Sequence, residues 1–230
     1  MDPKELFPSW FEALSHSARS SWRDQKSWLY DETSTFAYYN GFFNTLIVPT
    51  LLLSHPLFYA GGPAALNYGG LGTTIGHEIT HIFDVYLKMS KENSNLEPGF
   101  KEEFMKRIEC LRASGRAPVE ATAGREAVNS TLDSIELANF VAVTTAYKAF
   151  LLLLNNVREK KLSNLNLSAK QLFFINYCVK LCDETSAQTT GYSSFRSRCM
   201  VPLMNMPDFS EVFGCAPGAS MNPRRKCALW

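Results

Sequence analysis

Histidine is scarce in this sequence, with four residues among 230, and long apolar runs are missing. No run reaches the roughly 18 apolar residues of a membrane-spanning helix, so we expect no membrane segment in this chain. Residues 1–5 are polar and no apolar core follows them, so we identify no signal peptide. The formal net charge of +1, without a basic run that carries interleaved aromatic residues, argues against nucleic-acid binding.

Cysteine is present but scattered, in a pattern that does not fit a zinc ribbon. Its six positions are 110, 178, 182, 199, 215 and 227. Two acceptor triplets for N-glycosylation begin at Asn129 and Asn166, and they favour a secretory compartment. At 46% hydrophobic residues, a chain of this length can form one substantial core.

The sequence His77-Glu78-x-x-His81 carries the main functional signal. Residues four apart share one face of a helix, so both imidazoles can point at one metal ion. Glu78 lies beside that face, where a carboxylate can take a proton from a metal-bound water. The alternative is a buried helix with two incidental histidines, although a chance match is only on the order of one per cent here. Three isoleucines at helical spacing predict the buried side of this helix: Ile75, Ile79 and Ile82.

The residues around this motif resemble the neprilysin and endothelin-converting-enzyme family of zinc metallopeptidases, which are gluzincins. The resemblance starts at Ala65–Gly72, continues through Ile75–Asp84, and covers nearly the whole chain. Later segments match the family's C-terminal, zinc-bearing part in the same order: Gln171–Ile175, Asn205, Phe209–Cys215 and Met221–Trp230. The family's larger N-terminal part has no counterpart here, which suggests a truncated product, a fragment or a divergent short form.

The resemblance implies a mainly α (α+β) fold: a thermolysin-like zincin domain with a small edge β-sheet beside the HExxH helix. It also implies one Zn²⁺ ion, a peptide substrate or ligand, and an extracellular or secretory-pathway location. We divide the chain into an N-terminal helical segment, residues 1–32, with one or two short helices, and a metallopeptidase domain, residues 33–230.

The family places an Asn-Ala-aromatic edge strand beside its site, and its asparagine and alanine hold the substrate backbone. Here Ala37 matches, but Phe36 stands where the asparagine is expected, which removes a donor and an acceptor for an extended peptide. Phe36 either contacts substrate or simply packs. Residues 46–49 predict a second strand that ends at Pro49.

A third zinc ligand is expected from a later helix, where the family has a glutamate and, four residues on, an aspartate that orients a zinc histidine. Counting from Thr131 places Ser134 at the ligand position. Counting back from Ala146 and Tyr147, which also match the family, places Ile135 there and Asn139 at the aspartate.

Neither count reaches Glu136, although a shift of one residue, about 100° on a helix, would bring it in. We therefore predict Glu136 as the third ligand, with Asp133 as a substitute and a solvent-facing Glu136 as the alternative. Asn139 can accept a hydrogen bond from an imidazole N–H but supplies no negative charge, which should weaken zinc binding by about 10–100-fold.

On the transition-state side, the family uses a histidine six residues before an arginine to stabilise the oxyanion. Arg198 matches the arginine, and Tyr192 occupies the histidine position. Tyrosine can donate one hydrogen bond, and loss of an oxyanion donor typically costs about 10²–10³ in rate. Arg198 either binds a peptide carboxylate or carbonyl, or forms a structural salt bridge.

The resemblance also implies that Cys110 pairs with Cys227, and that Cys182 and Cys215 match positions whose partners lie in the family's N-terminal part. Pairing of Cys182 with Cys215, pairing of Cys178 with Cys199, and free thiols remain open.

Periodicity predicts further helices over 100–111, 131–157 and 169–182, the last with Ser168 as its N-cap. We expect the apolar run Leu151–Leu154 to be buried, and the HExxH helix to extend to about Tyr86. Three hypotheses follow: a working zinc endopeptidase with Glu78 as the base, a non-catalytic homologue that binds peptides or a protein partner, and an incomplete fragment that is not stable alone.

Overall fold

The computed structural model describes residues 3–23, 34–83, 98–115, 130–182 and 195–228. The chain divides into two compact units, Met1–Ser34 and Thr35–Trp230. The first unit holds α1 (Pro3–Arg23), one long helix where one or two short ones were expected. Its large apolar side chains, among them Phe7, Phe11 and Trp22, are exposed.

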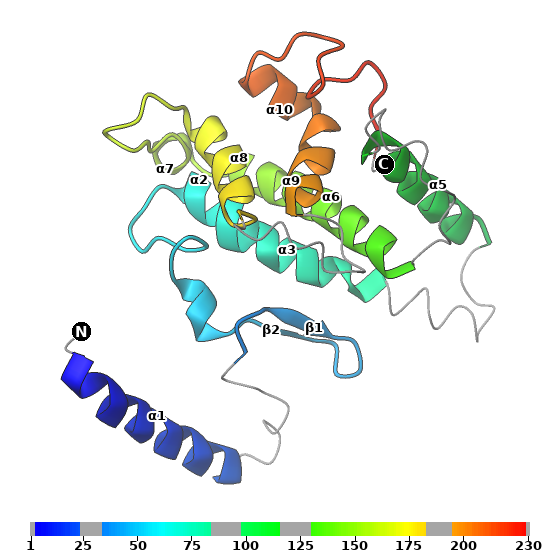
Figure 1. The fold of residues 1–230 in the computed structure, drawn as a ribbon. Helices are drawn as coiled ribbons and strands as arrows, with labels where there is room; N and C mark the ends of the chain where they lie inside the picture. Colours follow the sequence, from blue (N-terminus) through cyan, green and yellow to red (C-terminus); the bar gives the residue numbers. More distant parts are fainter. Residues whose placement is uncertain (1–2, 24–33, 84–97, 116–129, 183–194, 229–230) are drawn as a thin grey trace. The chain divides into compact units, whose positions relative to one another are not determined.

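The second unit begins with a small antiparallel hairpin of β1 (Tyr38–Asn40) and β2 (Thr45–Ile47), shown in Figure 1. Pro49 follows β2, as the sequence predicts, and a 3₁₀ turn covers Thr50–Leu53. Ala37, just before β1, is buried, whereas Phe36 is 77% exposed. Phe36 is therefore not part of the core.

After the loop of residues 54–63, a continuous helical segment leads into the HExxH motif. It consists of α2 (Ala64–Asn67), a π-helical turn η2 (Tyr68–Gly72) and α3 (Thr73–Thr80). A side chain at Gly69 would collide with the carbonyl of Phe173, and one at Gly70 with the carbonyl of Leu57. The two glycines therefore let this segment lie directly against its neighbours, and π-helical turns of this kind are frequent at functional sites.

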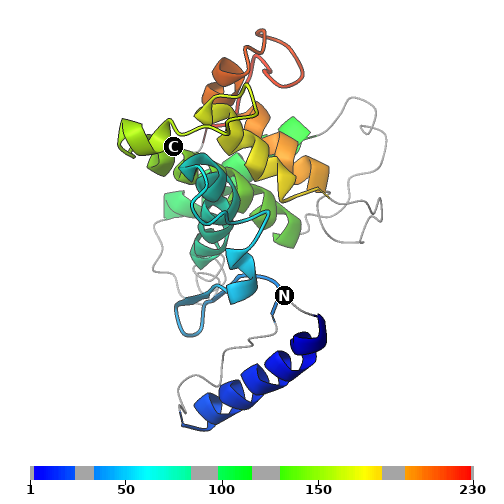
Figure 2. The same ribbon diagram turned by 90° about the vertical axis from the view of Figure 1, so that its left-hand side faces the viewer.

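Helix α3 runs beside α6 (Ser130–Leu151), as Figures 1 and 2 show from two directions. The contact is made by small residues: a Cβ at Gly76 would lie 3.3 Å from Cα of Ala142. Thr73 and Thr80 are buried, whereas Ile79 is 51% exposed. The prediction that Ile79 lies on the buried side is therefore wrong, because a close approach of two helix backbones selects small side chains over branched ones.

The core is formed by α6 together with α5 (Pro98–Gly115), α8 (Ala169–Val179), α9 (Phe195–Met204) and α10 (Pro207–Val212). Ser168 caps α8 in a capping box with Gln171, as predicted. The centre of the core is an aromatic cluster: Tyr147, Phe150, Phe173, Phe174 and Phe209.

Helix α6 ends at Leu151, short of the predicted Val157, and the short helix α7 covers Asn155–Arg158. In the Leu151–Leu154 run, Leu152 is 87% and Leu154 is 74% exposed. The expectation of a buried apolar run is therefore wrong for these two residues, because the chain leaves the helix there and turns to the surface.

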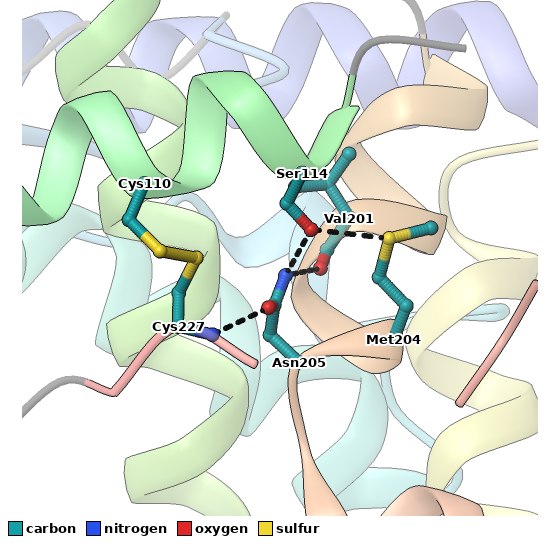
Figure 3. Close-up of a disulfide and its surroundings, with 6 residues drawn as sticks. All are labelled: Cys110, Ser114, Val201, Met204, Asn205 and Cys227. Atoms are coloured by element: carbon teal, nitrogen blue, oxygen red, sulfur yellow. Dashed lines mark hydrogen bonds between the residues drawn. A yellow bond between two sulfur atoms is a disulfide. The ribbon is translucent and has the colours of Figure 1, made fainter. Parts of the chain in front are cut away.

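One disulfide ties α5 to the C-terminal segment and a second joins α8 to α9. Cys110 of α5 is joined to Cys227, as the resemblance implies, and Cys178 is joined to Cys199. Beside the first bond, Asn205 accepts a hydrogen bond from the Cys227 N–H and donates to Ser114 Oγ (Figure 3). Cys182 and Cys215 are free thiols. Within the described ranges, no helix is long and apolar enough to cross a membrane.

Candidate metal centre and peptide site

The two imidazoles of the HExxH motif converge. Helix α3 ends at Thr80, Ile82 and Phe83 are again helical, and the rest of the predicted helix up to Tyr86 lies outside the described residues. The C-cap residue His81 keeps helical backbone angles and so lies one turn beyond His77. Their Nε2 atoms are 3.2 Å apart, with the ring planes at 82°. Two nitrogens bound about 2.0–2.1 Å from one tetrahedral zinc ion lie about 3.3 Å apart, so this pair fits the ion.

The electrostatic surroundings keep His77 neutral. Burial, with smaller contributions from His81, Arg198 and Lys180, lowers the pKa of His77 to about 3. A zinc ligand must present the neutral imidazole, because the lone pair that binds the metal is the one that protonation occupies. His77 is therefore ready to bind a metal throughout the physiological pH range.

Glu78 lies next to the imidazoles. One ligand atom each from His77, Glu78 and His81 lies within 4.8 Å of the others. The N–H of Tyr39 in β1 donates to Oε2 of Glu78 across 3.2 Å, so the edge hairpin is fixed against the motif. Burial raises the pKa of Glu78 above its ordinary value, against the opposing charge of His81 and the Tyr39 hydrogen bond.

Asn139 of α6 is buried, and its side chain interacts with His77 and opposes the fall in the pKa of that histidine. The position therefore agrees with the count back from Ala146. Nδ1 of His77 and Nδ2 of Asn139 are both buried without a hydrogen-bond partner. An amide turned by 180° would present its oxygen to an imidazole N–H at Nδ1 of His77. The effect of Asn139 on zinc remains a prediction.

The segment expected to supply the third zinc ligand does not join the group formed by His77, Glu78 and His81. Ile135 is buried, and Glu136 accepts a hydrogen bond of 3.1 Å from the hydroxyl of Ser197 in α9. Glu136 does not belong to the group formed by the motif residues. Its role as a ligand remains a prediction. The Asp133 side chain and all of Tyr192 lie outside the described residues.

Arg198 lies in α9, close enough to Glu78 and His77 to affect their pKa values. Its backbone carbonyl accepts a 2.7 Å hydrogen bond from Tyr177, and its guanidinium stands 5.5 Å from the centre of the Phe195 ring. The Nε–H group is buried without an acceptor. The structural salt bridge considered as one role for Arg198 is not formed with any described residue.

Lys180 was missed by the sequence analysis. It is the C-cap residue of α8, and its ammonium donates to Oγ1 of Thr73 at 2.6 Å and to Oγ1 of Thr74 at 3.1 Å. Burial, and then the charge of Arg198, lower the pKa of Lys180 to about 7. The available signal was weak: a lysine that follows the C-terminal end of a helix whose centre is apolar.

A helix that presents two histidines and a glutamate beside an edge hairpin, inside a helical core, defines the zincin class of metallopeptidases. The family model of peptidase family M13 matches residues 36–229, and the chain belongs to that family. The fold expected from the resemblance is thereby confirmed.

Curated relatives agree with this assignment. The chain is 33% identical to neprilysin-1 of Trittame loki over 222 residues. The aligned region covers 89% of this chain and 31% of that protein. It is 31% identical over 265 residues to endothelin-converting enzyme 1 of Cavia porcellus, covering 100% of this chain and 34% of the relative. The chain therefore spans about a third of the length of these relatives.

Solved structures share the fold. The zinc metalloprotease Zmp1 of Mycobacterium tuberculosis, in complex with an inhibitor, superposes with a TM-score of 0.73 at 23% identity, covering 90% of this chain and 34% of that one. A Haemonchus galactose-containing glycoprotein complex gives a TM-score of 0.70 at 24% identity, with the same coverage.

Proposed function

We propose that this chain is a neprilysin-like zinc metalloendopeptidase domain that hydrolyses peptide bonds. The observation that carries this proposal is the convergence of the His77 and His81 Nε2 atoms at 3.2 Å, with the Glu78 carboxylate beside them. A zinc ion held by these imidazoles, and by Glu136 as the third ligand, would supply an activated water as the nucleophile.

Glu78 serves as the general base. Its carboxylate receives the proton of the attacking water and passes it to the leaving amine. A pKa raised by burial suits this task, because a base works best when its pKa approaches the working pH. The Tyr39 N–H holds one carboxylate oxygen and leaves the other for the proton.

The edge hairpin receives the peptide. Among the described residues β1 pairs with β2, and in this proposal an extended peptide adds to the other edge of β1 by main-chain hydrogen bonds. Ala37 immediately precedes this strand and Arg198 lies in α9 near the motif, so both contact the substrate backbone in this proposal. Tyr192 is the proposed oxyanion donor. The proposed location is the secretory lumen or the extracellular space, where the Cys110–Cys227 disulfide is stable.

The test is cleavage of a mixed pool of unstructured peptides by the zinc-loaded chain, followed by mass spectrometry. Glu78→Gln should bind zinc and peptide but lower the cleavage rate by about 10²–10⁴-fold, the usual contribution of a general base. Glu109→Gln, which changes an exposed glutamate of α5, is the matched control and should cleave normally. Zinc-loaded protein that leaves every peptide intact would refute the proposal.

A second candidate function is peptide or protein binding without turnover. It is favoured by the bond between Glu136 and Ser197, which holds the expected ligand in another contact, and by the buried Ile135 beside it. Peptide binding that persists after zinc removal, with no cleavage before it, would identify this function.

A further inference from the structure

Lys180 and Arg198 form a pair of cations beside the HExxH motif with too few acceptors. The ammonium of Lys180 has three donors, of which two are used by the Thr73 and Thr74 hydroxyls. None of the described residues accepts a hydrogen bond from the guanidinium of Arg198, and its Nε is fully buried. Unpaired charges of this kind are costly to bury. The described residues supply no acceptor for the remaining donors of these two cations.

The two side chains act on one another and on the same neighbours. The charge of Arg198 lowers the pKa of Lys180, and both cations lower that of His77. Among the described residues, the carboxylate whose charge acts on both is Glu78, which is already bonded to Tyr39 and forms an ion pair with neither cation. One base carboxylate thus cannot neutralise both cations, and a net positive charge remains beside the two histidines.

We infer that Lys180 and Arg198 form a subsite that binds a carboxylate of the peptide, so that the domain selects peptides with an anionic group next to the site. This inference rests on the proposed peptide-binding function and adds a preference to it. Either an acidic side chain or a free C-terminal carboxylate has the required chemistry, since both present two oxygens to a guanidinium and an ammonium.

The hydrogen bonds of Thr73 and Thr74 favour a ligand-binding role for Lys180 over a purely structural one. The Thr73 hydroxyl is already bonded to the carbonyls of Gly69 and Gly70, and the Thr74 hydroxyl to that of Gly70. These threonines do not need a lysine to satisfy them. What they do is hold the ammonium at the first turn of α3, one to two turns from His77 and Glu78.

The experiment measures binding of acetylated, C-terminally amidated peptides in which one glutamate is moved through each position, each paired with a glutamine twin. A third arm leaves the C-terminal carboxylate free, to distinguish the two sources of the anion. Titration calorimetry on the full zinc-loaded chain gives the dissociation constant of each peptide that is not cleaved. For peptides that are cleaved, the values of kcat/KM are compared instead.

We expect at least one glutamate peptide, or the free-acid peptide, to bind about 10–100-fold more tightly than its neutral twin, as charge-assisted hydrogen bonds imply. Lys180→Met should abolish that ratio by weakening only the anionic peptide, and Lys180→Arg should retain most of it. Lys170→Met, which changes an exposed lysine of the same helix, should leave the ratio unchanged. Equal binding of all twins, or a ratio that survives in Lys180→Met, would overturn the inference.

A second measurement separates this inference from the proposed function. N-acetylglutamate alone should raise the melting temperature of the wild type and of Lys170→Met, but not of Lys180→Met. If it does so while no peptide binds, the anion subsite stands and peptide binding falls. If it stabilises none of them and no peptide binds, the subsite is refuted as well.

Discussion

The hydroxyl of Ser197 donates a 3.1 Å hydrogen bond to Oε1 of Glu136, so that α9 holds the carboxylate that the sequence offers as a third zinc ligand. The two histidines converge on one point, whereas the proposed third ligand has a protein partner. Zinc binding by Glu136 must compete with this hydrogen bond.

The first prediction concerns that competition. Ser197→Ala should tighten zinc binding by about 3–10-fold, because the carboxylate no longer loses a hydrogen bond to reach the ion. Glu136→Gln should weaken zinc binding by more than the roughly 10–100-fold that loss of a ligand's hydrogen-bond partner costs. Titration against a chromophoric chelator measures both, and an unchanged affinity in Glu136→Gln would exclude Glu136 as a ligand.

Asn139 gives the second prediction. Asn139→Asp would place a negative charge beside His77, orient its imidazole and increase its basicity as a ligand. Zinc affinity should rise by about 10–100-fold. Asn164→Asp adds the same charge at an exposed loop position and should leave the affinity unchanged within error. A rise of equal size in both variants would point to net charge instead of a local effect.

Some of the features behind these predictions can be read from the sequence, and others cannot. The HExxH spacing, the hairpin ended by Pro49 and the capping box at Ser168 are local, and each is decided by residues within one or two turns. The exposure of Ile79 is not local, because Gly76 lets α6 approach on the face that a hydropathy pattern assigns to polar residues. Apolar periodicity measures what can be buried, not which face a partner helix covers.

Lys180 shows the same limit in the site. Its sequence neighbours describe an apolar helix that ends, and a lysine at a helix C-terminus is ordinary. Only the packing of α8 against α2 and η2, which lead into α3, brings its ammonium to Thr73 and toward Glu78. The two disulfides lie between these cases, since spacing alone allowed several pairings and the fold selects two.

A third prediction follows from the pKa of Lys180, which is lowered from 10.5 in the unfolded chain to about 7. The folded state therefore disfavours the charged form, and this cost is fully present below pH 7. It declines as the pH rises from 7 to 10.5 and vanishes above that, so this residue makes the protein more stable at higher pH.

Lys180→Met removes the buried charge and keeps the length of the side chain. Its free energy of unfolding should exceed that of the wild type by about 1–3 kcal/mol at pH 6, with little difference near pH 10. Urea denaturation at the two pH values measures this, and Lys170→Met should match the wild type at both. A variant that is less stable than the wild type at pH 6 would mean that the bonds to Thr73 and Thr74 outweigh the cost of the charge.

The last prediction compares the two disulfides. Cys110 and Cys227 are 117 residues apart, whereas Cys178 and Cys199 are 21 apart. In the chain-entropy description, a crosslink stabilises by restricting the unfolded chain, more so for a longer loop, and this difference amounts to about 1.5 kcal/mol. The Cys110→Ala/Cys227→Ala double variant should therefore lose more stability than Cys178→Ala/Cys199→Ala, as measured by urea denaturation.

The Asn205 network beside Cys227 adds to the loss, because Asn205 is buried and depends on that segment for a donor. Asn205→Ala alone, with both disulfides intact, separates this contribution from the crosslink. Equal losses in the two double variants would show that native packing, and not the unfolded chain, determines what each bond contributes.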